Sequence, residues 1–284
     1  MTTRLRHPSW IKMRPRGGEP YRQLKRVLGE LKLHTVCDEA QCPNIGECWA
    51  HGAATVILMG DVCTRRCHFC AVGKGKPAPL DAAEPANVAE GVARLGLKHV
   101  VLTSVNRDDL DDQGSGHFAA TITAIHARCP NCTIEALVPD FRGDRDCVAR
   151  VANAPLTVFA HNVETAPRLY KTVRPGSEYE RSLRVLSLAK EIRCDLRTKS
   201  GLMLGLGETN DETLAVARDL RAHGCDIFTL GQYLRPSARE LPVARYVTPE
   251  EFAELREKSA ALGFRHVESG PLVRSSYHAW RQIG

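Results

Sequence analysis

Two groups of three cysteines are the residues of this sequence best suited to chemistry. Six of the eleven cysteines fall within 34 residues, as the triplets Cys37-x4-Cys42-x5-Cys48 and Cys63-x3-Cys67-x2-Cys70. An odd cysteine count, in a sequence whose start lacks the continuous apolar segment of an export signal, argues against a disulfide framework. We therefore expect reduced thiols that bind metal.

The spacing of the triplets favours iron–sulfur clusters. A [4Fe–4S] cluster takes four protein ligands when it only carries electrons. Three cysteines leave one iron open to bind a small molecule, as the vacant position of a catalytic zinc site does. Structural zinc is the alternative, but it prefers paired Cys-x2-Cys units, and neither triplet has a second pair, although His68 lies close by. Ferredoxin spacing matches neither triplet. The sequence predicts two [4Fe–4S] clusters.

An alternation of strands and helices supplies the scaffold for these cysteines. Short β-rich runs lie at 55–60, 98–104, 133–138, 156–161, 195–204 and 226–231, and helical patterns lie at 87–97, 116–127, 144–152, 178–190 and 211–222. This order is typical of parallel strands with crossover helices. Six units occupy 177 residues, fewer than the about 250 of an eight-unit barrel. We predict an α/β fold with a partial (β/α)6 TIM-type barrel; an open doubly wound sheet is the alternative.

The predicted barrel divides the chain into three parts. Residues 1–54 form an N-terminal extension with the first triplet, residues 55–231 form the barrel, and residues 232–284 form a C-terminal extension. The second triplet directly follows the first strand, at the edge where such barrels carry their chemistry. The same edge is expected to hold the cofactor contacts Thr103, Ser104, Asn162, Glu164 and Lys199.

Positive charge is concentrated at the N-terminus. Residues 1–36 hold nine Lys or Arg and two Glu, a net charge of +7, so the remaining residues sum to −1. Such a segment attracts an acidic partner or serves solubility. Aromatic residues within it are limited to Trp10 and Tyr21, so we expect no nucleic acid partner. No apolar run is long enough to cross a membrane, and we expect a cytoplasmic protein.

The second triplet, with Phe69 before its last cysteine, resembles the signature of the radical S-adenosylmethionine superfamily. The resemblance implies that the open iron of this cluster binds the amino and carboxylate groups of S-adenosylmethionine. Reductive cleavage then gives a 5′-deoxyadenosyl radical. Arg174 is a further candidate for a carboxylate contact. Gly201-x3-Gly205-x2-Glu208 resembles the strand that packs on adenine, although glycines here also suit a tight turn before a helix capped by Thr209 or Asn210.

The first triplet resembles the auxiliary-cluster motif of the lipoyl synthase family. The resemblance runs from Pro8 to Ala279 and is carried by residues 35–49, 103–109, 161–165, 173–175 and 274–277. It implies that Cys37, Cys42 and Cys48 hold an auxiliary cluster whose fourth ligand is a serine, for which we choose Ser276 over Ser275. Asn106 departs from the family, which more usually has Asp there.

The same resemblance implies the reaction. The auxiliary cluster would supply two sulfur atoms to C6 and C8 of an octanoyl chain amide-linked to a lysine of a carrier protein. That carrier would be a lipoyl domain or the glycine-cleavage H protein, and the electrons would come from ferredoxin or flavodoxin. Unactivated C–H bonds resist acid and base chemistry, which is why a radical is needed. The alternatives are a methylthiotransferase, and a non-catalytic iron–sulfur carrier or zinc-stabilised binding module.

Overall fold

One open sheet organises the structure, a computed structural model that describes residues 7–12, 19–36, 42 and 44–283. Its strands follow the order β1-β2-β5-β6-β7-β8-β9-β10. β1 pairs with β2 antiparallel, and every other neighbouring pair in this sheet is parallel. The bounds are β1 His34–Thr35, β2 Ala53–Leu58, β5 His99–Ser104, β6 Thr133–Leu137, β7 Val158–Ala160, β8 Arg197–Leu204, β9 Ile227–Gln232 and β10 His266–Gly270.

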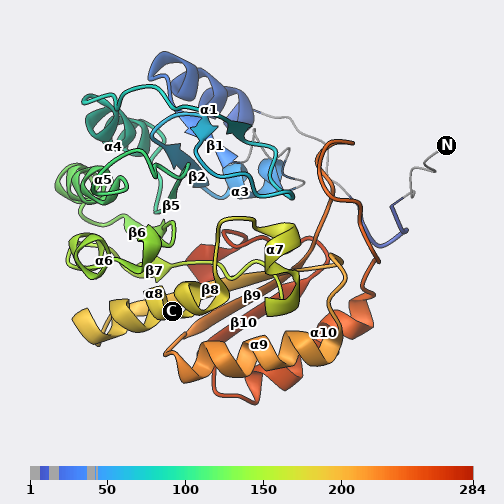
Figure 1. Cartoon of the computed structure of the whole chain (residues 1–284). Coiled ribbons are helices and arrows are strands. Elements are labelled where there is room, and N and C mark those ends of the chain that lie inside the picture. The colour runs from blue at the N-terminus through green and yellow to red at the C-terminus, as the bar shows by residue number, and fades with distance from the viewer. Residues whose placement is uncertain (1–6, 13–18, 37–41, 43, 284) are drawn as a thin grey trace.

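The helices lie between the strands along the chain. They are α1 (Glu19–Glu30), α3 (Ile45–Ala50), α4 (Glu84–Arg94), α5 (Ser115–Arg128), α6 (Arg145–Ala152), α7 (Tyr170–Val173), α8 (Tyr179–Ile192), α9 (Asn210–Ala222) and α10 (Pro249–Ala260), with 3-10 turns at Phe141–Gly143, Pro167–Leu169 and Ala279–Arg281. Helices α4, α5, α6, α8, α9 and α10 line the outside of the curved sheet (Figure 1).

The strand order separates the two predicted folds. From β2 to β10 the parallel strands follow one another in sequence order, without the reversal that defines a doubly wound sheet. Sequential order with helices outside is the arrangement of a TIM-type barrel, and the sheet of the described residues stays open between β1 and β10. The partial barrel is therefore confirmed.

The sheet also continues beyond residue 231. All six predicted strands are present with ends shifted by at most three residues, and β10 adds a further parallel strand beside β9. The sequence His266–Gly270 carries no run of apolar residues, and every residue of β10 is only half buried. Since apolar periodicity is the main signal for strands, the C-terminal segment did not predict this one.

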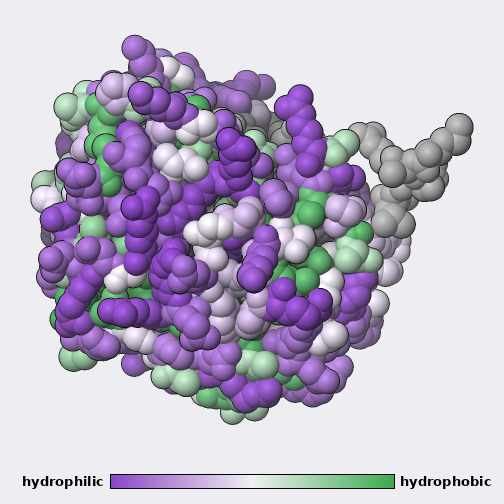
Figure 2. Space-filling model, in the orientation of Figure 1, coloured by the Kyte–Doolittle hydropathy of each residue, from purple (hydrophilic) through white to green (hydrophobic). Residues whose placement is uncertain are grey.

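Apolar side chains join the sheet to its helices in two clusters. One cluster joins β2, β5 and β6 to α4, α5 and α6, and a second joins β8 and β9 to α9 and α10. The face shown in Figure 2 is mostly hydrophilic, with apolar residues scattered among polar ones. Among the described residues, no helix has the length and apolar character that crossing a membrane requires.

The C-terminal segment lies directly against the barrel. A Cβ at Gly231 in β9 would sit 2.1 Å from the Val273 carbonyl oxygen, so only glycine permits this close approach. The next residue back along the chain, Leu272, accepts a hydrogen bond of 2.6 Å from Asn44 Nδ2. The two ends of the chain therefore meet beside the first strands of the sheet.

Candidate active site

The second cysteine triplet begins where the chain leaves β2. Met59 and Gly60 both have positive φ, 68° and 90°, which turns the chain sharply away from the strand. A positive φ is strained for methionine. The buried carboxylate of Glu84 accepts two hydrogen bonds from the Met59 amide, at 2.9 and 3.1 Å, and is also bound by His117 Nε2 at 2.5 Å. These contacts hold the turn that presents the cysteines.

Backbone amides surround the first thiol of the loop. Cys63 Sγ accepts hydrogen bonds from the amides of Arg65 at 3.4 Å and Asn106 at 3.2 Å. The short strands β3 (Val62–Cys63) and β4 (Gly73–Lys74) close the base of the loop. Hydrogen bonds to sulfur are a feature of iron–sulfur sites. Asn106 donates this hydrogen bond through its backbone amide, so having Asn where the family more usually has Asp does not change the contact with Cys63.

The middle of the loop is fixed by two distant segments. His68 donates its amide to the Val173 carbonyl at 2.9 Å, and its Nδ1 lies 2.7 Å from the Thr172 carbonyl oxygen. The His68 carbonyl accepts from the Leu241 amide at 3.0 Å. The loop therefore has a defined shape set by both halves of the barrel.

The remaining two thiols lie in a poorly solvated place. Burial raises the pKa of the Cys70 thiol to about 11. Burial also raises the pKa of the Cys67 thiol, although the positive charge of Arg174 partly offsets this increase. Metal binding displaces such thiol protons. Within the described part of the chain, no three His, Cys, Asp or Glu side chains converge closely enough for a single metal ion.

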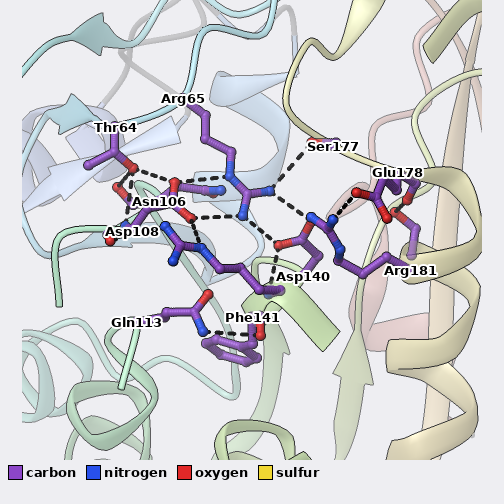
Figure 3. A network of polar contacts seen from close by, with 12 residues as sticks. Thr64, Arg65, Asn106, Asp108, Gln113, Asp140, Phe141, Ser177, Glu178 and Arg181 are labelled. Carbon is purple, nitrogen blue, oxygen red and sulfur yellow. Dashed lines mark hydrogen bonds and ion pairs between the residues drawn. The ribbon is translucent and has the colours of Figure 1, made fainter. Parts of the chain in front are cut away.

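Arg65, between the first two cysteines, ties the loop to two strands. Its guanidinium binds Asp108 at 2.9 and 3.0 Å and Asp140 at 2.7 and 2.8 Å, and Figure 3 shows it between the two carboxylates. Asp108 follows β5, Asp140 follows β6, and Asp140 also receives Arg181 at 3.3 Å. Beside this network lies a cleft of about 600 Å³, lined by Thr64, Arg65, Arg66, His68, Asp108, Arg142, Pro175, Gly176 and Arg181.

Three of the predicted cofactor contacts carry buried polar atoms without a partner among the described residues. They are Ser104 Oγ, Asn162 Oδ1 and Arg174 Nε. Such atoms are costly unless a ligand or water satisfies them. Arg174 is held in place by hydrogen bonds from Nη1 to the carbonyls of Asn162 at 2.8 Å and Val163 at 3.3 Å. The residues present thus fit a polar ligand such as the amino-acid part of S-adenosylmethionine.

Glu164 lies beside the same group. Burial raises the pKa of its carboxyl, against the positive charge of Arg174, and Asn162 Nδ2 donates to Glu164 Oε1 at 3.1 Å. Its φ of 64° is unusual for a residue other than glycine. Strained backbone of this kind clusters at ligand sites.

The other two expected contacts are already engaged. Thr103 Oγ1 donates to the Leu137 carbonyl at 3.0 Å. Lys199 is fully buried in the barrel, and its ammonium holds both carboxylate oxygens of Glu135 at 2.9 Å. This ion pair favours a structural role for Lys199, whose contact with the cofactor stays a prediction.

The glycines after β8 form the expected turn, while packing on adenine stays a prediction. Gly205 and Gly207 have φ of 101° and 115°, and the Glu208 carboxylate accepts from the Gly205 amide at 2.5 Å. Thr209 caps α9 through a capping box, so the turn interpretation is confirmed. Gly201 is also constrained, because a Cβ there would lie 2.9 Å from Asn162 Oδ1.

A second pocket brings the first triplet together with the C-terminal motif. It is lined by Cys42, Asn44, Ile45, Cys48, Ala53, Ala54, Thr55, His99, Val101, Arg274, Ser276 and Tyr277. Ser276 lines this pocket, whereas Ser275 does not. Cys37 lies outside the described residues. Two thiols and one hydroxyl in one pocket form a donor set that suits iron.

Contacts between the chain ends close this pocket. The Glu47 carboxylate binds Tyr277 Oη at 3.4 Å and His278 Nε2 at 3.1 Å. Burial lowers the pKa of Arg274, although the nearby Cys42 thiol opposes this shift. The C-terminal segment is therefore fixed against α3, the helix that carries Cys48.

Sequence reasoning missed Arg65, Asp140 and His99. Arg65 had a signal, because it lies inside the cysteine loop. Asp140 follows a predicted strand, as the expected contacts do. His99 is a polar residue at the start of an apolar strand, and burial, together with the charge of Lys199, lowers its pKa to about 3. It is therefore neutral.

Comparisons with known proteins define the class. The pattern of the radical SAM superfamily matches residues 57–220, more than half of the chain. Among solved structures, methylornithine synthase shares the fold with a TM-score of 0.59, 13% identity and coverage of 86% of this chain and 81% of that chain. Streptococcus suis SuiB gives a TM-score of 0.58 at 10% identity, over 81% of this chain and 53% of that chain. The chain is a radical SAM enzyme with a partial TIM-type barrel.

More similar relatives narrow the class. The N-terminal domain of lipoyl synthase matches residues 1–42. A lipoyl synthase of Thioalkalivibrio sulfidiphilus is 57% identical over 279 residues, which cover 98% of this chain and 87% of that protein. A lipoyl synthase of Rubrobacter xylanophilus is 55% identical over 275 residues, covering 97% and 86%. The chain belongs to the lipoyl synthase family.

Proposed function

We propose that this enzyme inserts two sulfur atoms, at C6 and C8, into an octanoyl group on a lysine of a carrier protein. The observation that carries this proposal is the second pocket, in which Cys42 and Cys48 from one end of the chain meet Ser276 from the other. A methylthiotransferase has no need of that serine. The relatives named lipoyl synthase support the same assignment.

Two [4Fe–4S] clusters divide the work. Cys63, Cys67 and Cys70 hold the cluster that, with S-adenosylmethionine, supplies the 5′-deoxyadenosyl radical. Cys37, Cys42, Cys48 and Ser276 hold the auxiliary cluster, which supplies sulfur. An alkoxide binds iron less well than a thiolate does, so the Ser276 bond is the one most easily released.

The protein's own residues position S-adenosylmethionine. Ser104 Oγ and Arg174 Nε offer buried hydrogen-bonding atoms to its amino-acid part, and Asn162 and Glu164 lie beside them. Thr103 and Lys199 support this group from within the barrel through the Leu137 carbonyl and Glu135. Burial excludes water from the place where a carbon radical forms, which prevents side reactions.

The partners follow from the substrate. The carrier is a lipoyl domain or the glycine-cleavage H protein, and the electrons come from ferredoxin or flavodoxin in the cytoplasm. The cleft beside the cysteine loop supports docking of an acidic carrier, because Arg66 and Arg142 are exposed at its rim. No nucleic acid and no membrane take part.

Anaerobic incubation with an octanoyl-lysine peptide, S-adenosylmethionine and a reductant tests the proposal. We expect the peptide to gain two sulfur atoms by mass spectrometry, and the protein to contain about eight irons with matching sulfide. Methylthio transfer, or zinc without sulfide, would contradict it.

A further inference from the structure

His99, at the start of β5, has a ring nitrogen without a partner in the pocket of the first triplet. The residue is 2% exposed, and its Nε2 is buried with no hydrogen bond to any described residue. Its side chain lines the same pocket as Cys42, Cys48 and Ser276. Buried polar nitrogens of this kind normally have a partner, so the pocket is missing one.

The neighbours of His99 indicate which ring nitrogen carries the proton. The Lys98 carbonyl accepts from the Thr133 amide at 3.0 Å and from the Thr133 hydroxyl at 3.1 Å. The hydroxyl has a single proton. With that proton on the Lys98 carbonyl, His99 Nδ1, 2.8 Å from Thr133 Oγ1, is the donor in that contact.

This leaves a lone pair on the buried Nε2 of a residue that lines the pocket of Cys42 and Cys48. A metal-ligating histidine is a neutral imidazole of this kind. One ring N–H donates a hydrogen bond to an oxygen, and the other ring nitrogen is unprotonated and binds the metal. The opposite tautomer would put an N–H into the pocket and take the Thr133 proton away from Lys98. A satisfied core histidine does not fit either, because Nε2 has no partner among the described residues.

We propose that His99 Nε2 is an iron ligand of the auxiliary cluster, binding the iron that Ser276 releases. This assignment rests on the proposed function, which puts that cluster in this pocket. The step is a ligand exchange at one iron. Nε2 would donate its lone pair as the Ser276 oxygen leaves; that oxygen would take a proton from water, leaving hydroxide, and no electron would be transferred. Imidazole suits iron, so the exchange would keep a partly dismantled cluster attached to the chain.

Pulsed electron paramagnetic resonance can detect this bond. The background variant is Cys63→Ala/Cys67→Ala/Cys70→Ala, which leaves only the auxiliary cluster, and Ser276→Ala is added to vacate one iron. The protein is reconstituted anaerobically with iron and sulfide and then reduced. We expect a strong nitrogen coupling that changes when the histidines are labelled with ¹⁵N. Further substitution of His99→Phe should abolish the coupling and speed iron loss to a chelator by about tenfold or more.

His161→Phe is the matched control. His161 is 1% exposed and its Nε2 is also unpartnered, but its Nδ1 faces the Val138 carbonyl and it does not line this pocket. The coupling should survive this substitution. The ¹⁵N-labelling experiment leaves His99 in place, so it tests for a nitrogen ligand even if His99→Phe fails to fold.

The other results are also decisive. About four irons per chain with no nitrogen coupling, or with only the weak coupling of a hydrogen bond, would overturn the role of His99 and leave the auxiliary cluster standing. Absence of iron from the background variant would overturn both the cluster in this pocket and the role of His99.

Discussion

Arg65 and Asp140 are joined by two parallel hydrogen bonds of 2.7 and 2.8 Å, with the carboxylate fully buried and the arginine side chain 9% exposed. The pair connects the loop of the second triplet to the carboxyl end of β6. Paired geometry of this kind is the strongest form of an ion pair in proteins. The loop that carries the thiols is thus anchored by the barrel and not by its own turns alone.

Removal of Arg65 should destabilise the protein strongly. Arg65→Met leaves the buried Asp140 carboxylate with the weaker contact to Arg181 at 3.3 Å, and a broken buried pair costs about 3–5 kcal/mol. Anaerobic urea unfolding would measure the loss, and Arg65→Met/Asp140→Asn should recover part of it. Arg94→Met is the control, because its ion pairs with Glu90 and Glu30 are exposed and contribute little to stability. Equal losses for both variants would contradict this view.

Acid should weaken the fold through the same carboxylate. Burial raises the pKa of Asp140, but the hydrogen bonds and charge of Arg65 more than offset this, so the pKa is lowered overall. Below about pH 5 the unfolded chain therefore takes up a proton that the folded chain does not. The free energy of unfolding decreases as the pH is lowered.

Asp140→Asn should flatten that dependence between about pH 5 and pH 3. Unfolding titrations at a series of pH values compare the slopes. An unchanged slope in Asp140→Asn would show that other carboxyls govern acid sensitivity.

Substitutions in the two triplets should have different effects on the reaction. Cys67→Ala removes a ligand of the cluster that cleaves S-adenosylmethionine, so 5′-deoxyadenosine should disappear. Cys42→Ala should still give some 5′-deoxyadenosine but no sulfur in the peptide. Chromatography of the nucleoside and the mass of the peptide measure both. Lipoyl product from Cys42→Ala would refute the division of labour.

Neighbouring serines offer a matched comparison. Ser276 lines the pocket with Cys42 and Cys48, and Ser275 does not. Ser276→Ala should lower the yield of doubly sulfurated peptide at least about tenfold, in the range of losses at metal sites. Ser275→Ala should retain most of it. The reverse order would reassign the ligand.

Gly231 should control whether the C-terminal segment reaches this pocket. The Cβ of Gly231→Ala would lie 2.1 Å from the Val273 oxygen and push the segment away from β9. We expect cleavage of S-adenosylmethionine to continue while sulfur insertion falls. Gly29→Ala in α1 has nothing within 4 Å of its new Cβ and should behave as the parent protein. Full sulfur insertion by Gly231→Ala would show that the segment tolerates displacement.

Local patterns determined much of this protein. The cysteine spacing, the six apolar strand runs and the Gly205 to Thr209 turn all depend on neighbours along the chain, so the sequence alone predicted them. Lengths of strands and helices follow from the same short-range preferences. The expected contacts Ser104 and Asn162 also came from position, since each lies at or just beyond the end of a strand.

Only the tertiary structure decided which distant groups meet. The bonds of Arg65 to Asp140, the ion pair of Lys199 with Glu135 and the arrival of Ser276 beside Cys42 span many residues, and no local pattern encodes such pairings. β10 was hidden because a half-buried edge strand needs few apolar residues. His99 gained its chemical meaning only when folding buried its Nε2 beside two thiols, because desolvation and the loss of water partners are properties of the packed chain.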